Sequence, residues 1–214
     1  MNRNTFFITE DNITTLLAHG NDCEPNAEVA INSPCYCIYT SGSTGRSKGT
    51  ILTHQNVTNY VNNNEKNVVH SIIRESYQTI VSVTTVGFDI FVTESILPLV
   101  SGMTVLFANE KQARLQTALN AFLLKNPADV LQTTPTKMRS LLSDPAQCEY
   151  LKCLKTIILG GEAVDSALVA NLYKLTSARI FNIYGPTETT VWSTNTEIVS
   201  ADDITIGMQK ARKQ

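Results

Sequence analysis

The 214-residue sequence lacks the features that mark several common protein classes. Positive charge is not in excess, because 17 Lys and Arg are set against 19 Asp and Glu, so the electrostatic footprint of a nucleic-acid-binding protein is missing. No long apolar run follows the N-terminal stretch Met1–Phe7, so neither a signal peptide nor a membrane span is expected. We therefore expect a cytoplasmic protein that binds neither nucleic acid nor membrane.

Clustered metal-binding and nucleophilic residues are also scarce. The five cysteines are odd in number and show no C-x-x-C spacing, and the three histidines are scattered at positions 19, 54 and 70. Reduced thiols are expected, and a zinc site or a disulfide framework is not. No Ser-His-Asp or Cys-His arrangement can be defended, and the sequence contains neither a P-loop nor a G-x-G-x-x-G motif.

What is present is an alternation of apolar, β-rich runs with helical stretches in a chain that is 43% hydrophobic. The runs predict strands at 36–39, 79–84, 103–107, 129–132, 156–159 and 179–183. Helices are expected after Thr53 and at 88–100, 111–125, 135–142 and 166–175. This order predicts an α/β fold with mostly parallel sheets and helices on both faces. We expect a poorly defined lead-in at 1–33, one domain at 34–207, and a frayed tail at 208–214.

A loop rich in glycine and hydroxyl residues follows the first apolar run, with the sequence TSGSTGRSKG over Thr40–Gly49. Glycine lets backbone N–H groups turn toward an anion, hydroxyls add donors, and lysine adds a mobile positive charge. A flexible linker is the alternative, but a linker needs no lysine and rarely joins two apolar segments. The pattern predicts a phosphate cradle made by Thr40, Ser41, Gly42, Ser43, Thr44, Gly45 and Lys48.

A second segment, Asn182–Thr190, has the sequence NIYGPTETT and follows the last predicted strand. Tyr184 offers a flat face for a base, Thr187 a hydroxyl for phosphate, and Glu188 a hard oxygen ligand for Mg²⁺. Taken alone, the segment is equally compatible with an ordinary Gly-Pro turn before a capped helix.

In this order, the two segments resemble the phosphate loop and the N-x-Y-G-P-T-E-T-T motif of adenylation domains of nonribosomal peptide synthetases, in the adenylate-forming (AMP-binding) superfamily. Ser47 stands where that family usually has proline. The resemblance implies part of the large N-terminal subdomain, with Lys48, Thr187 and Glu188 in catalytic roles and Glu188 holding Mg²⁺. Nucleotide contacts would come from Gly161 and Glu162 of a G-G-E turn, and from Asn182, Ile183, Tyr184 and Thr187.

Asp89 begins an otherwise apolar helical stretch and is, by itself, most simply read as a helix N-cap. In the resembled family, this F-D position pairs with the α-ammonium group of an amino acid. The resemblance implies a substrate pocket made by Asp89, Ile90, Thr93, Gln132, Ile158, Gly160, Ile183, Val191 and Trp192. The set is similar to the family's glycine pattern, although Thr93 replaces a leucine-like residue, and we expect glycine or another small amino acid.

The implied reaction joins an amino acid to ATP with Mg²⁺, giving aminoacyl-AMP for the phosphopantetheine thiol of a peptidyl carrier protein. No T-G-D motif or distal catalytic lysine of that family is found after Gly207, so we expect the isolated chain to be inactive or nearly so. Two alternatives stay open. One is a fragment of an acyl- or aryl-CoA synthetase, which Asp89 disfavours, and the other is a noncatalytic nucleotide-binding remnant.

Overall fold

The computed structural model describes residues 14–15, 18–20, 28–40, 47–62, 68–69, 72–73 and 76–206. The chain divides into two compact units, Met1–Ala30 and Ile31–Gln214, and each is described by itself. In the first unit, the described residues 14–15 and 18 are helical and exposed. Within the described part of the chain, every helix is too short or too polar to cross a membrane. The expected boundaries at 33 and 207 stay predictions.

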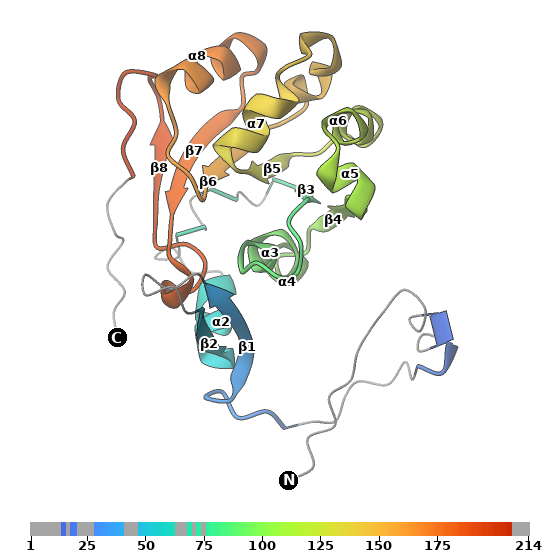
Figure 1. The fold of residues 1–214 in the computed structure, drawn as a ribbon, viewed down its shortest axis with the longest axis vertical. Coiled ribbons are helices and arrows are strands. Elements are labelled where there is room, and N and C mark those ends of the chain that lie inside the picture. Colours follow the sequence, from blue (N-terminus) through green and yellow to red (C-terminus); the bar gives the residue numbers. More distant parts are fainter. Residues whose placement is uncertain are drawn as a thin grey trace. The chain divides into compact units, whose positions relative to one another are not determined.

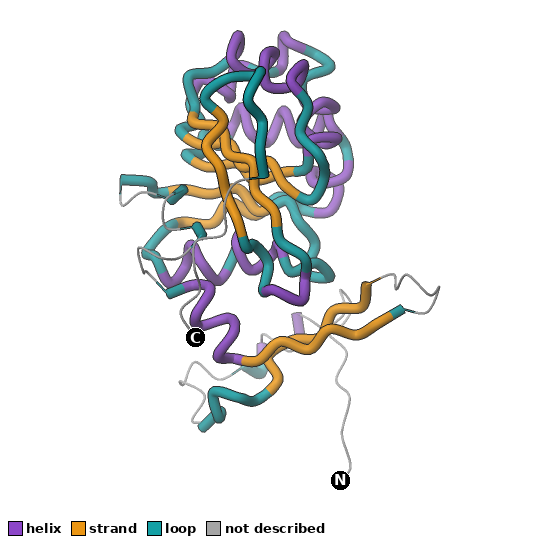
Figure 2. Tube along the Cα trace, turned by 90° about the vertical axis from the view of Figure 1, so that its left-hand side faces the viewer, coloured by secondary structure: helices purple, strands orange, loops and turns teal. Residues whose placement is uncertain are grey.

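A six-stranded sheet forms the centre of the second unit (Figures 1 and 2). Its strand order is β4-β3-β5-β6-β7-β8, and all neighbours are parallel except β7 and β8, which run antiparallel. The strands are β3 (Thr79–Ser82), β4 (Thr104–Phe107), β5 (Val130–Thr133), β6 (Thr156–Gly160), β7 (Arg179–Tyr184) and β8 (Thr194–Ile198). The predicted α/β class with a mostly parallel sheet is therefore confirmed.

Both faces of the sheet are covered, because side chains of successive strand residues point to opposite faces. Leu131 and Ile157 belong to a core closed by α6 (Gln116–Lys125), α7 (Pro135–Leu141) and α8 (Ser166–Leu175). Their neighbours Val130 and Ile158 belong to a second core, closed by α2 (His54–Val61), α3 (Ile90–Glu94) and α4 (Ile96–Val100). In Figure 1, the first group of helices lies above the sheet and α3 and α4 lie below it. Every residue of β5 and β6 is buried, and burial on both faces explains the apolar run Ile157–Leu159 of β6.

The first predicted strand is present but does not join this sheet. Pro34–Thr40 forms β1, which pairs antiparallel with β2 (Lys48–Thr53) in a separate two-stranded sheet. The expectation of a strand-helix alternation beginning at residue 36 was therefore wrong here. A parallel neighbour needs a crossover of a dozen or more residues, and the connection at 41–47 is too short for one.

Two predicted helices are each divided into two. The stretch 88–100 contains α3 and α4 with a break at Ser95, and Pro98 has no N–H to donate to the carbonyl of Glu94. The stretch 111–125 contains α5 (Glu110–Arg114) and α6, separated by Leu115, whose backbone is extended (φ −97°, ψ 121°). Leu115 is 51% exposed, so its apolar side chain lies outside the core. Among the described residues, three 3₁₀ turns are also present: η1 (Pro145–Gln147), η2 (Glu149–Lys152) and η3 (Thr187–Thr189).

Candidate functional site

The residues singled out by sequence gather at the carboxyl edge of the parallel strands, where ligands bind in sheets of this type. Asp89 follows β3, Gln132 lies near the end of β5, and Gly160 ends β6. Tyr184 ends β7, and the loop 185–193 carries Trp192 back to the start of β8. Four separate parts of the chain thus contribute side chains to one edge.

Gly160 lies against two large side chains with no room for a methyl group. A Cβ built at this position would be 2.6 Å from Cγ2 of Ile183 and 2.6 Å from Cη2 of Trp192. Ile183 and Trp192 are each 2% exposed, so both side chains are closely packed beside Gly160. Glycine is therefore required at the end of β6, and the indole edge lies directly over its backbone.

The loop after β7 is held in an uncommon backbone conformation. Thr190 and Val191 have positive φ angles of 69° and 62°, which a β-branched residue rarely adopts. A Cβ on Gly185 would be 2.2 Å from the carbonyl oxygen of Val191, so the two sides of the loop approach closely. Strained backbone of this kind persists only where the surroundings impose it, and it is often found at functional sites. Nothing in the sequence pattern indicated it.

A buried chain of hydrogen bonds joins three elements beside Gly160. The indole Nε1–H of Trp192 donates to Oε1 of Gln132 over 3.1 Å. Nε2 of Gln132 in turn donates to Oε1 of Glu94 over 3.2 Å. Burial raises the pKa of Glu94, while hydrogen bonds from Thr84, Val83 and Gln132 oppose that rise. Sequence reasoning missed Glu94, although it is the only charged side chain in the apolar stretch 90–100.

Asp89 is 9% exposed, and its Oδ2 is buried without a hydrogen-bond partner. Its backbone is already helical (φ −63°, ψ −25°), and its side chain makes no cap hydrogen bond to α3. Asp89 thus occupies the N-cap position of α3, as its place in the sequence predicted, but its side chain does not make the capping hydrogen bond. Burial raises the pKa of Asp89; hydrogen bonds, the strongest from Thr187, oppose the shift, and the charge of Glu188 adds to it.

The remaining residues of the predicted pocket lie in the second core or at its margin. Thr93 is fully buried, and its hydroxyl lies 2.6 Å from the hydroxyl of Tyr60 on α2. Ile158 is fully buried within the sheet, Val191 is 1% exposed, and Ile90 is partly buried against the same core. The sequence did not identify Tyr60, which is 33 residues away from Thr93.

A pocket of about 520 Å³ lies beside the ends of β6 and β7. Its lining includes five residues that the resemblance assigned to nucleotide binding: Gly161, Glu162, Asn182, Ile183 and Tyr184. Tyr184 is 51% exposed, so its ring is accessible. Ile204, Thr205 and Ile206 also line the pocket, and Nδ2 of Asn182 donates to the carbonyl oxygen of Thr205 over 2.8 Å.

The G-G-E turn on the near side of this pocket is fixed to α7. The carboxylate of Glu162 accepts a hydrogen bond from the backbone N–H of Thr136 over 3.0 Å. Hydrogen bonds from Thr136 and Thr134, together with the charge of Arg139, lower the pKa of Glu162. Glu162 is exposed, and in this position it orients the turn.

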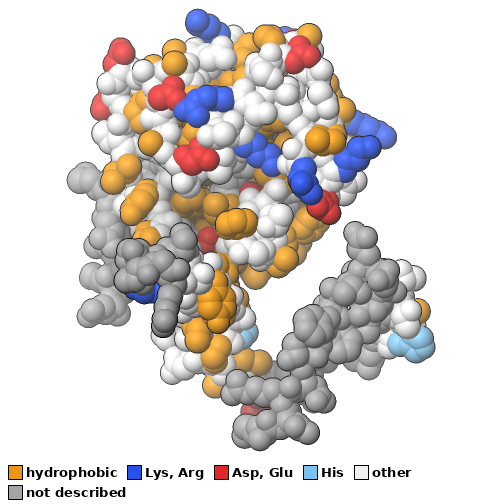
Figure 3. All heavy atoms as spheres, viewed as in Figure 1, with side chains coloured by type: hydrophobic (Ala, Val, Ile, Leu, Met, Phe, Trp, Pro, Cys, Tyr) orange, Lys and Arg blue, Asp and Glu red, His pale blue; other side chains and the backbone are white. Residues whose placement is uncertain are grey.

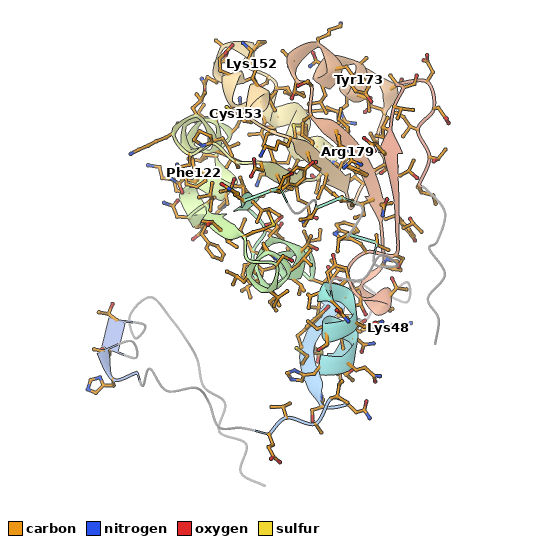
Figure 4. The ribbon with its side chains drawn as sticks, turned by 180° about the vertical axis from the view of Figure 1, so that it is seen from behind. Lys48, Phe122, Lys152, Cys153, Tyr173 and Arg179 are labelled. Atoms are coloured by element: carbon orange, nitrogen blue, oxygen red, sulfur yellow. The ribbon has the colours of Figure 1, made fainter. Side chains whose placement is uncertain are left out.

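Only the two ends of the predicted phosphate cradle lie within the described residues. Thr40 ends β1 and stands opposite Lys48, the first residue of β2. Ser41, Gly42, Ser43, Thr44 and Gly45 lie outside the described residues. Lys48 is exposed, and β2 contacts η3, which contains Thr187 and the exposed Glu188 (Figure 4). On the face shown in Figure 3, positive and negative side chains are interspersed.

Comparison with known proteins identifies the family. The profile of the AMP-binding enzyme family matches residues 5–211. The chain belongs to this family. Its adenylation-domain relatives include a dimodular nonribosomal peptide synthase of Bacillus subtilis, 36% identical over 168 residues, covering 78% of this chain and 7% of that protein. Surfactin synthase subunit 1 of the same species is 32% identical over 171 residues, covering 78% and 5%. The chain thus spans under a tenth of these relatives.

Solved structures of AMP-binding enzymes show the same fold. A four-domain nonribosomal peptide synthetase bound to AMP and glycine is 29% identical, with a TM-score of 0.69 over 82% of this chain and 12% of that one. The N-terminal subdomain of NpsA from Klebsiella oxytoca, in complex with 3-hydroxybenzoyl-AMSN, is 19% identical with a TM-score of 0.74. That alignment covers 90% of this chain and 47% of that one. The resemblance to nonribosomal peptide synthetase adenylation domains is confirmed.

Proposed function

We propose that residues 34–207 carry the amino-acid and nucleotide sites of an ATP-dependent adenylation domain that activates glycine or another small amino acid. In the proposed reaction, an oxygen of the amino-acid carboxylate attacks the α-phosphorus of ATP, the bond to the β-phosphate breaks, and pyrophosphate leaves. The product, aminoacyl-AMP, would pass its acyl group to the phosphopantetheine thiol of a peptidyl carrier protein. The observation that carries this proposal is the buried Oδ2 of Asp89.

A buried carboxylate oxygen without a donor is costly unless a ligand supplies one. The α-ammonium group of an amino acid would supply both a hydrogen bond and a positive charge. Plain fatty or aryl acids carry no such cation, so Asp89 favours an amino acid over the substrates of acyl- or aryl-CoA synthetases. Asp89 is also the only acidic residue among the nine proposed for the substrate pocket.

The preference for a small side chain is supported by the packing around Gly160. The indole of Trp192 and the methyl group of Ile183 leave no space for even one added carbon on Gly160. Gln132 is 1% exposed and is held by hydrogen bonds on both sides, so it cannot move aside freely. A site with such fixed walls would admit glycine more readily than leucine or phenylalanine. The similar synthetase that was solved with AMP and glycine is consistent with this assignment.

The nucleotide fits the chemistry of the neighbouring pocket. The accessible ring of Tyr184 offers a stacking face. The pocket's volume of about 520 Å³ suits an adenine ring with part of its ribose. Glu188 offers the hard carboxylate oxygen that Mg²⁺ prefers, next to the hydroxyl of Thr187. Lys48, on the strand that contacts η3, would offset phosphate charge. These groups would act by positioning the reactants and by offsetting charge.

Binding to the 214-residue chain tests the proposal. We expect a nonhydrolysable glycyl-adenylate analogue to bind at least about tenfold more tightly than its acetyl counterpart, and Asp89→Asn to remove that difference. Calorimetry would measure both. Tighter binding of the acetyl analogue would favour the acyl-CoA synthetase alternative. Binding of ATP·Mg²⁺ with equal affinity for the two analogues would favour the noncatalytic remnant.

A further inference from the structure

We propose that Glu94 is a positioning residue that sets the direction of the Gln132 amide and thereby holds Trp192 against the substrate pocket. The role in substrate selection rests on the function proposed above, while the positioning of Trp192 does not. Glu94 itself lies one hydrogen bond away from the pocket residues, so it would influence selectivity without contacting the amino acid.

Glu94 is fully buried and accepts four hydrogen bonds. Its Oε2 accepts from the backbone N–H groups of Val83 and Thr84, both over 2.8 Å. Its Oε1 accepts from the hydroxyl of Thr84 over 2.8 Å and from Nε2 of Gln132 over 3.2 Å. A buried charge is tolerated when its lone pairs are matched in this way. The carboxylate therefore joins the loop after β3 to β5.

The bond from Gln132 has a direction, and that direction determines what Trp192 meets. An ionised carboxylate can only accept, so Gln132 must turn its NH₂ group toward Glu94. Its Oε1 is then left facing Trp192, whose indole N–H can only donate. Both neighbours demand the same amide orientation. Glu94 thus fixes the amide orientation in which Gln132 accepts the hydrogen bond from the indole N–H.

The indole edge of Trp192 lies in the proposed pocket, next to Gly160. Cη2 of Trp192 lies where it would approach a Cβ on Gly160 to 2.6 Å. A rotation of the ring would either collide with this strand end or open the space that now excludes larger side chains. Because Trp192 is 2% exposed, the hydrogen bond to Gln132 is a buried bond whose loss water would not repair.

The chain contains a single tryptophan, so the indole N–H gives one identifiable signal in a ¹H–¹⁵N spectrum of the full 214-residue chain. In Glu94→Gln, the new amide must offer its oxygen to the N–H groups of Val83 and Thr84. Its NH₂ group would then face Gln132, forcing that amide to reverse and present NH₂ to the indole N–H. We expect the indole N–H to exchange with solvent about tenfold faster than in the parent chain.

The swapped double variant Glu94→Gln/Gln132→Glu separates the positioning role of Glu94 from a general structural effect. The carboxylate now stands at position 132, accepts from the amide at 94 on one side, and accepts from Trp192 on the other. We expect protection of the indole N–H to return. Glu110→Gln, at a glutamate whose side chain is 74% exposed, is the matched control and should leave the signal unchanged.

The proposal would be overturned if the indole N–H stayed as protected in Glu94→Gln as in the parent chain. It would also be overturned if the indole N–H of the swapped double variant exchanged as fast as that of Glu94→Gln. If Glu94→Gln does not fold, the swapped double variant decides alone. A folded double variant with a protected indole N–H supports the positioning role of Glu94, and any other result rejects it.

Substrate selection is measured separately, as the ratio of binding of the glycyl to the leucyl adenylate analogue. We expect Glu94→Gln to reduce this ratio about tenfold. An unchanged ratio, despite lost protection, would overturn the selectivity role. Failure of the parent chain to bind either analogue would count against the proposed function, and the indole signal would still decide the positioning role.

Discussion

The hydroxyl groups of Tyr60 and Thr93 lie 2.6 Å apart, and this buried hydrogen bond joins α2 to α3 across 33 residues of sequence. Tyr60→Phe would leave the fully buried hydroxyl of Thr93 without this partner, so we expect the free energy of unfolding to fall by about 1–3 kcal/mol. Urea denaturation would measure it. Tyr60→Phe/Thr93→Val should be less destabilised than the sum of its single changes. Tyr39→Phe, at a residue that is 72% exposed, is the control.

Gly160→Ala should destabilise the chain by about 1–3 kcal/mol, because the added carbon would displace closely packed neighbours. The added carbon would lie 2.6 Å from both Ile183 and Trp192. Thermal unfolding would measure the loss of stability, and Trp192 fluorescence would report the displacement of the indole. Gly87→Ala is the matched control, since the nearest atom to its Cβ, Oγ1 of Thr85, is 3.8 Å away. Equal stability of the two variants would contradict the packing described here.

Asp89→Asn should stabilise the chain at neutral pH while weakening binding of the glycyl-adenylate analogue. The pKa of Asp89 is raised, chiefly by burial, so the folded state favours the protonated carboxyl group. Its contribution is most favourable below the unfolded pKa of about 3.9 and is lost as pH rises through the folded pKa. The gain from Asp89→Asn should therefore vanish at low pH. A variant that is less stable than the parent at pH 7 would show that hydrogen bonds to Asp89, such as the one from Thr187, outweigh the cost of its burial.

Asp129 should have the opposite pH dependence. Burial alone would raise its pKa, but the ion pair with Lys155 (2.7 Å) and the N–H groups of Gln78 and Thr79 lower it. Stability from this carboxylate is present above the unfolded pKa and is lost as pH falls through the folded pKa. We expect Asp129→Asn to cost about 1–3 kcal/mol at pH 7 and much less in acid. Unfolding measured between about pH 3 and 7 would test this, with Glu110→Gln as the exposed control.

The sequence was most informative where burial is extreme. The clearest case is β6, which is buried on both faces and contains the continuous apolar run Ile157–Leu159. The two missed strands, β2 and β8, carry polar residues at most positions, and only Leu52 and Ile198 in them are buried. Their pairing depends on neighbours that local pattern does not reveal. Leu115 shows the same limit, because its apolar side chain is half exposed at a helix break.

The resemblance assigned Asp89, Gly160 and Trp192 to one pocket, and that assignment stays a prediction, but no sequence signal indicated the contacts that the structure shows. Glu94 gave only the weak signal of a charge inside an apolar stretch. Its partners Gln132 and Val83 lie 38 and 11 residues away, so their meeting depends on the folded sheet. The positive φ angles of Thr190 and Val191 were equally hidden, since neither residue type favours them.

The antiparallel pairing of β7 with β8 holds the two ends of the loop 185–193 together. Tyr184 stands opposite Thr194, and the N–H of Ser193 donates to the carbonyl of Tyr184 over 2.8 Å, so both ends of the loop are joined. Glu188, proposed to hold Mg²⁺, and Trp192, proposed for the amino-acid pocket, therefore lie in one loop whose two ends are joined. Neither can shift along the chain without the other. Under the proposed function, a change of the bound amino acid would come from exchanged side chains, because a longer loop would displace Glu188 and Trp192 together.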